Sequence, residues 1–194
     1  MIRVLLGALL GAAACLLWSA ISWEALDWHR TATLSFTNEA AVAKVVAANA
    51  KKHGLYVLPT IPAMKSGART EAIAAEKKAR TETQEGPFVY AVVRPGPQEL
   101  SHAARVALTY ARSLVACFIV GLLLLQTARL DYVQKVGFCV LCGLFAGLVT
   151  DVPSLIWFEA PFRLTFINVA DHVCEWFLAG LVISGFVECK SGFE

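Results

Sequence analysis

Long apolar runs divide the chain and predict transmembrane helices. A helix that crosses the hydrocarbon core of a bilayer needs about 20 consecutive residues that are mostly apolar. Three runs meet this length with few polar interruptions, at residues 4–23, 106–127 and 132–150. Arg112 lies inside the second run and Lys135 lies near the start of the third.

A fourth span is predicted near the C-terminus, although its uncharged part is short. Residues 176–187 carry no charge, but they are too few to cross a bilayer alone. A complete span, 166–187, must therefore contain Asp171, His172 and Glu175 in its first turns. Side chains three or four positions apart are neighbours on a helix. Glu175 is thus expected to lie beside both Asp171 and His172.

The polar stretch between the first two spans, residues 24–105, alternates helical and strand-like patterns. Apolar residues recur at helical spacing in residues 38–52, which predicts a helix. A second helix is predicted at 70–83, because this segment is rich in Ala, Glu and Lys. Short runs bounded by turn residues predict strands at 32–36, 55–59 and 88–96. Thr37 is the expected N-cap of the first helix. Together these patterns predict a small α+β domain with the element order β-α-β-(α)-β.

Composition supports a membrane-embedded α-helical protein. Hydrophobic residues make up 57% of the 194 residues and the mean hydropathy is +0.60, whereas soluble domains are about 45–50% apolar. We predict a four-transmembrane-helix bundle with a small extracytoplasmic α+β domain between helices 1 and 2. Its parts are transmembrane helix 1 at 1–23, the outer domain at 24–105 and a three-helix membrane unit at 106–194. A net charge of +2 gives no reason to expect nucleic acid as a partner.

The first run also resembles a secretory signal, because it follows a basic residue and contains small residues. It continues without a break to Trp23, which favours an uncleaved anchor. A cleaved signal and a lipoprotein signal ending at Cys15 remain the alternatives.

The short loops indicate an orientation, because Lys and Arg accumulate in cytoplasmic loops. Arg163 stands alone in the loop expected at 151–165. The opposite side carries Arg3, Arg129, Lys135 and Lys190. This bias predicts a multi-pass protein of the bacterial inner membrane with both termini in the cytoplasm.

Charged side chains are expected to cluster in the outer part of the membrane. Helical rise places five residues there: Arg112, Asp151, Asp171, His172 and Glu175. An ionised group in hydrocarbon costs at least about 2.5–3.5 kcal/mol, so we expect Arg112 to pair with Glu175 or Asp171. The cluster is interpreted as structural ion pairs or, alternatively, as a site for a proton, a cation or a substrate.

Cys139 and Cys142 form a CxxC motif in the third span. Metal or c-type haem binding is not expected, because no second pair is present and Gly143 follows the motif. Four spans, a long outer loop and this motif are similar to the vitamin K epoxide reductase family, which implies a redox role for the two cysteines. That family, however, places its pair in the last span near the outer face and relays electrons through loop cysteines. Buried thiols acting as small apolar residues are the favoured interpretation.

The sequence contains no nucleophile motif, phosphate-binding loop or metal-ligand spacing. We therefore predict a non-enzymatic accessory, assembly or interaction protein that acts through its outer domain, with a protein partner or a second copy and without a cofactor. The alternative is a membrane-embedded enzyme or small-solute or ion transporter that uses the polar cluster.

Overall fold

A computed structural model describes residues 1–59, 69–127 and 130–188 of the chain. The chain divides into two compact units. The four-helix unit comprises Met1–Leu34 and Leu100–Glu194, and the inserted unit comprises Ser35–Glu99. Each unit is described by itself.

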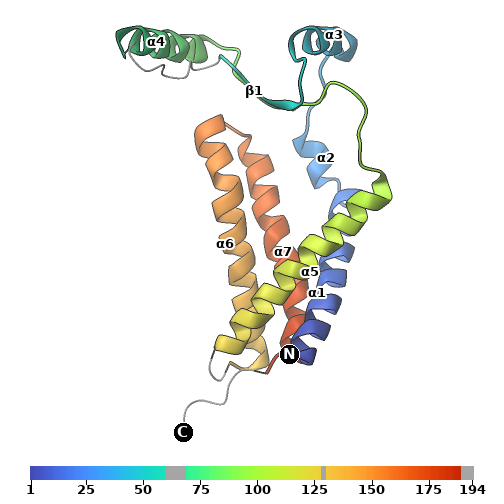
Figure 1. The fold of residues 1–194 in the computed structure, drawn as a ribbon. Helices are drawn as coiled ribbons and strands as arrows, with labels where there is room; N and C mark the ends of the chain where they lie inside the picture. Colours follow the sequence, from blue (N-terminus) through green and yellow to red (C-terminus); the bar gives the residue numbers. More distant parts are fainter. Residues whose placement is uncertain (60–68, 128–129, 189–194) are drawn as a thin grey trace. The chain divides into compact units, whose positions relative to one another are not determined.

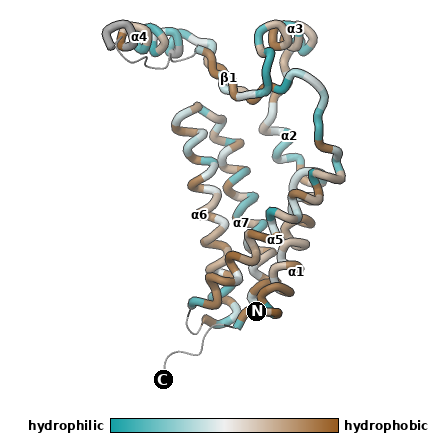
Figure 2. The backbone as a smooth tube through the Cα atoms, in the orientation of Figure 1, coloured by the Kyte–Doolittle hydropathy of each residue, from teal (hydrophilic) through white to brown (hydrophobic). Residues whose placement is uncertain are grey.

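Four helices in the first unit are long and apolar enough to cross a membrane. They are α1 (Ile2–Ala20) with its π-helical continuation η1 (Ile21–Ala25), α5 (His102–Gln126), α6 (Tyr132–Phe158) and α7 (Phe162–Phe186). The predicted membrane fold with four spans is thereby confirmed. Figure 1 shows α6 and α7 side by side and α5 running obliquely to them, and Figure 2 shows apolar residues along most of these helices.

Small residues allow α6 and α7 to approach closely. A Cβ atom added to Gly143 of α6 would lie 2.7 Å from the backbone oxygen of His172, and one added to Gly180 of α7 would lie 2.8 Å from Cβ of Cys139. Glycines at these positions let two helix backbones pack together, as is common between membrane helices. Helix α1 packs in turn against both α7 and α5.

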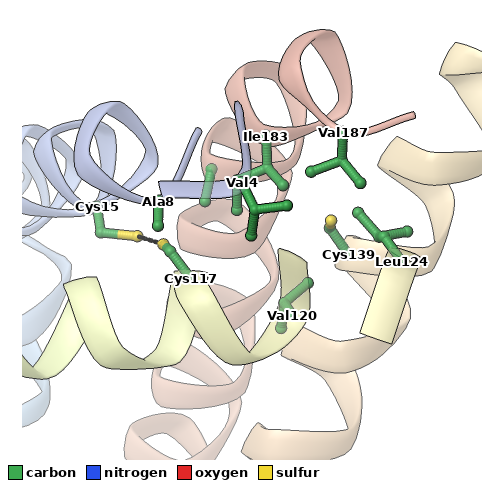
Figure 3. Close-up of a cluster of buried hydrophobic side chains, with 10 residues drawn as sticks. Val4, Ala8, Cys15, Cys117, Val120, Leu124, Cys139, Ile183 and Val187 are labelled. Atoms are coloured by element: carbon green, nitrogen blue, oxygen red, sulfur yellow. Dashed lines mark hydrogen bonds between the residues drawn. The ribbon is translucent and has the colours of Figure 1, made fainter. Parts of the chain in front are cut away.

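The core of the four-helix unit lies where α1, α5 and α7 meet (Figure 3). Leu124 and Ile183 are essentially inaccessible there, and Val4 and Val187 are nearly so. The thiols of Cys15 and Cys117 face each other across α1 and α5, with 3.9 Å between the sulfur atoms. Shape complementarity between small and branched side chains therefore holds these helices together.

Helix α6 continues past the expected end of the third span. The predicted loop at 151–165 is wrong, because α6 runs through Asp151 and Pro153 to Phe158. Residue Glu159, at φ 52°, then ends the helix in a left-handed conformation. Asp151 is thus a residue of the helix and does not close it. The predicted span ended before Asp151 and Pro153, because a charge and a proline usually end a membrane helix. Within a helix bundle, however, neighbouring groups can satisfy the backbone carbonyl that proline leaves without a partner.

A lysine from α6 contacts the last turn of α7. The Nζ atom of Lys135 donates to the carbonyl oxygens of Ser184 and Val187, at 2.9 and 2.8 Å. These carbonyls lack partners within the helix, and a cation there also suits the negative end of the helix dipole. The charge near the start of the third span therefore has a structural partner.

The inserted unit contains two helices and one two-stranded sheet. Its elements are α3 (Glu39–Asn49), β1 (Gly54–Leu58), α4 (Arg69–Glu85) and β2 (Val89–Val93). The strands pair antiparallel, with Gly54 opposite Val93 and Leu58 opposite Val89. A small α+β segment between the first two spans is as predicted.

The predicted strand at 32–36 is wrong. Residues Trp28–Ala32 form the short helix α2, and the following residues pair with neither described strand. The Thr31 and Thr33 hydroxyls donate to backbone oxygens of α2, and such local bonds compete with strand pairing. The cap of α3 also differs, since Asn38, and not Thr37, accepts a hydrogen bond from the Ala41 amide at 2.9 Å.

Candidate functional site

The predicted polar cluster lies within the four-helix unit on three helices. Arg112 belongs to α5, Asp151 to α6, and Asp171, His172 and Glu175 to α7. Helix α7 supplies most of the cluster because its polar residues occur at one-turn spacing in an otherwise apolar sequence. Two groups of polar contacts result, one from α7 to α5 and α6 and the other from α7 to the end of α1.

The first group begins with an ion pair between α5 and α7. The Nη2 atom of Arg112 donates to Oε1 of Glu175 at 2.7 Å and to Oγ of Ser113 at 3.2 Å. This contact confirms the expected pairing of Arg112 and selects Glu175 over Asp171. The exposed fraction is 60% for the Arg112 side chain and 12% for that of Glu175. The carboxylate is therefore enclosed, whereas the guanidinium keeps an accessible face.

The first group continues from α7 to α6 through an imidazole. His172 Nδ1 lies 4.0 Å from Glu175 Oε2, and its Nε2 lies 3.4 Å from Asp151 Oδ2. Asp151 also accepts hydrogen bonds from the Asn168 amide and the Thr150 hydroxyl, both at 2.9 Å. Two carboxylates thus flank one imidazole, which connects α7 to α6.

Asp171 belongs to a second polar group that joins α7 to the end of α1. Its Oδ1 accepts a hydrogen bond from the Trp18 indole at 2.6 Å. Its Oδ2 lies 3.5 Å from Nε2 of His29. The structure therefore pairs Asp171 with Trp18 and His29, whereas Arg112, a member of the same predicted cluster, pairs with Glu175.

His29 is the functional candidate that the sequence pattern does not reveal. It is only 3% exposed, its Nε2 lies 3.0 Å from Oγ of Ser22, and its ring stacks on Trp23 with 4.0 Å between centroids. Its Nδ1 has no hydrogen-bond partner among the described residues. The concentration of Trp18, Trp23 and Trp28 near the end of the first span is the signal that could have pointed to this packing, since Trp gathers where membrane meets water.

A cavity of about 200 Å³ adjoins the first group. Arg112, His172 and Glu175 line it together with Cys15 and Trp176. Helices α1, α5, α6 and α7 all contribute to its walls. The cavity gives these polar side chains a shared space inside the unit.

The two cysteines of the CxxC motif occupy different surroundings. Cys139 is fully buried in the core against Gly180, whereas Cys142 is half-buried between α5 and α6. Both lie on the continuous helix α6. Both cysteines thus act as small side chains in the packing between helices. The redox role implied by the motif stays a prediction.

The network can hold helices together and can bind a polar group at the Arg112 face. Among the described residues, no group of three or more His, Cys, Asp or Glu side chains is placed to hold a metal ion.

Comparison with known proteins finds no matching family model, and no curated protein or solved structure with significant similarity to this chain. Function must therefore be inferred from the residues themselves.

Proposed function

We propose that this multi-pass membrane protein is a non-enzymatic accessory or interaction protein that acts through residues 35–99. The observation that carries the proposal is how little this unit buries. Among its described residues only Ala50 and Ala79 are buried, and α3 buries none. Such a unit lacks the apolar burial that usually offsets the loss of chain entropy on folding.

The secondary structure of the inserted unit also depends on additional contacts. A single two-stranded hairpin is at best marginally stable in water, and an 11-residue helix such as α3 is marginal without tertiary packing. Large apolar side chains remain exposed on both helices and both strands: Val45, Leu55, Leu58, Ile73 and Val92. A protein surface that covers them would supply the missing burial.

The sheet suggests how a protein partner would bind. Among the described residues, strands β1 and β2 form a two-stranded sheet, so both are edge strands of that sheet. An extended segment of another chain can add to such an edge through backbone hydrogen bonds. We infer a protein partner or a second copy of this chain.

The proposal includes a location and an orientation. The excess of Lys and Arg in the short loops supports a bacterial inner membrane protein with both termini in the cytoplasm and residues 35–99 in the periplasm. A reporter active only in the periplasm should work when fused after Gly96 and be silent after Glu194. Activity of the C-terminal fusion would contradict this orientation.

The interaction itself is tested by capture from mild detergent, using the full chain and a version without residues 35–99. Val92, which is 74% exposed on β2, is replaced in Val92→Asp, and Lys77→Glu on α4 serves as the surface control. We expect a specific partner, or a dimer measured by light scattering, to be lost in the deletion and in Val92→Asp but retained in Lys77→Glu. Capture that does not depend on these residues would contradict the proposal.

The polar cluster supports a structural role more than catalysis or transport. Each of its three carboxylates already has a partner: Glu175 pairs with Arg112, Asp151 contacts His172, and Asp171 accepts from Trp18. Groups that pair in this way stabilise helix positions in a membrane. An enzyme or transporter remains the second candidate because of the cavity beside Arg112 and Glu175.

A further inference from the structure

A second, larger cavity opens between α5 and α6. Helix α6 packs mainly on α7, and α5 packs mainly on α1. A groove of about 450 Å³ lies between α5 and α6, a volume within the usual range of about 300–1,000 Å³ for ligand sites. Its walls are almost wholly apolar, with Ile119 and Leu123 from α5, Leu141 and Phe145 from α6, and Trp176 from α7.

The apolar groove and the polar cavity adjoin each other. Ala116, Ala146 and Trp176 line both of them. The two alanines come from α5 and α6 and have small side chains. From Arg112 to Leu123 the two adjoining spaces follow α5 for about 16 Å, at about 1.5 Å per residue. A polar end and a long apolar arm together match the shape of an amphiphile.

The most exposed charged side chain at the polar end is that of Arg112. The Arg112 side chain is 60% exposed, whereas Glu175 is 12% exposed and His172 30% exposed. Both of the hydrogen bonds that Arg112 makes to described residues use Nη2. Guanidinium carries five N–H donors in a planar arrangement suited to phosphate, so Nη1 and Nε can bind an anion while Nη2 holds Glu175.

We propose that the groove and the adjoining polar cavity together bind an anionic phospholipid of the bilayer, with one alkyl chain in the α5–α6 groove and its phosphate on Arg112. Burial of the chain supplies affinity, and the charge-assisted hydrogen bonds supply selectivity for the anionic head. The site goes beyond the proposed interaction function, because it uses only residues of the four-helix unit.

The test is lipid retention by the full chain in non-ionic detergent, measured by native mass spectrometry. Phosphatidylglycerol and phosphatidylcholine with identical acyl chains are titrated separately. We expect one phosphatidylglycerol per chain to bind about tenfold more tightly than phosphatidylcholine, which corresponds to about 1.4 kcal/mol. Equal retention of the two lipids would mean annular lipid only and would overturn the proposal.

Two sets of variants locate the site. Leu141→Trp fills the groove and should weaken phosphatidylglycerol binding about tenfold or more, whereas Leu144→Trp, at an exposed position of α6 outside the groove, should leave it unchanged. Arg112→Gln should abolish the preference for phosphatidylglycerol while phosphatidylcholine binding persists. Arg112→Lys, which keeps the charge, should retain part of the preference. Continued phosphatidylcholine binding by Arg112→Gln would show that its loss of preference does not reflect unfolding.

Two outcomes would contradict an amphiphile site in this cavity. Wild-type affinity in Leu141→Trp would overturn the assignment of the groove. Displacement of phosphatidylglycerol by millimolar inorganic phosphate alone would reveal a simple anion site and would overturn the role of the alkyl chain. Resistance to phosphate, combined with sensitivity to Leu141→Trp, supports the proposal.

Discussion

Residues 1–34 and 100–194 bury a continuous core between helices, whereas residues 35–99 expose most of their apolar side chains. The two regions also differ in how their charged side chains pair. The four-helix unit connects Glu175 to Arg112 across two helices, while α4 has local pairs one turn apart on an exposed surface, such as Arg80 with Glu76. Exposed pairs of this kind contribute about 0–1 kcal/mol.

This difference shows that the two units are stabilised by different surroundings. In the membrane, the absence of water makes each polar contact costly to break, so a few contacts can fix the helices. In the inserted unit, water competes for every charged group, and only burial of apolar surface could add substantial stability. The comparison therefore predicts large mutational effects in one region and small ones in the other.

Breaking the ion pair between Arg112 and Glu175 should have the largest effect. Losing one partner of a buried pair strands the other charge and costs about 3–5 kcal/mol; only Glu175 is enclosed here, so we expect a cost toward the lower end of this range. We expect Arg112→Leu and Glu175→Leu each to lower the melting temperature in detergent markedly, and the double variant to recover part of the loss. A loss in the double variant equal to the sum of the single losses would show that the pair contributes no coupling.

This pair also shows what sequence can predict. Helical rise gives the depth of a charge in a span, so it places Arg112 and Glu175 at similar levels. Depth alone cannot choose between Glu175 and Asp171, because the choice depends on how α7 is rotated relative to α5. The apolar pattern likewise predicts the four spans, since bilayer thickness fixes their length.

The remaining features depend on contacts that apolar patterns do not encode. His29 follows the first span closely in sequence, but its burial arises because α2 brings it against Ser22 and Asp171. Helix α6 passes Asp151 because neighbouring helices provide partners for its polar groups. Both cases reflect tertiary contacts that override a local signal.

The close approach of α6 and α7 predicts the next largest effect. In Gly143→Ala the new methyl group would meet the backbone oxygen of His172 at 2.7 Å, and overpacking of this kind costs about 1–3 kcal/mol. Gly137 of the same helix has no atom within 4 Å of an added Cβ, so Gly137→Ala should be neutral or stabilising by up to about 1 kcal/mol. Equal melting temperatures for the two variants would contradict the observed packing.

The two histidines outside the long helices allow a direct comparison of the units. His29→Leu removes the imidazole between Ser22 and Asp171, and a buried group left without its partner costs about 1–3 kcal/mol. His53, which is exposed in the inserted unit, should change stability by less than about 0.5 kcal/mol when replaced by Leu. Thermal unfolding in the same detergent measures both, and a larger effect at His53 would reverse the comparison.

Removing residues 35–99 should have the smallest effect on the four-helix unit. Every residue of the core around Val4, Leu124 and Ile183 comes from the four-helix unit itself. We therefore expect a Gly/Ser linker in place of residues 35–99 to shift the unfolding free energy by less than about 0.5 kcal/mol, or roughly 1–2 °C in melting temperature. Linkers of two lengths separate the loss of the unit from strain at the junction. A fall of many degrees with both linkers would show that the inserted unit supports the helices, and its apolar surface would then have an intramolecular role in place of an external partner.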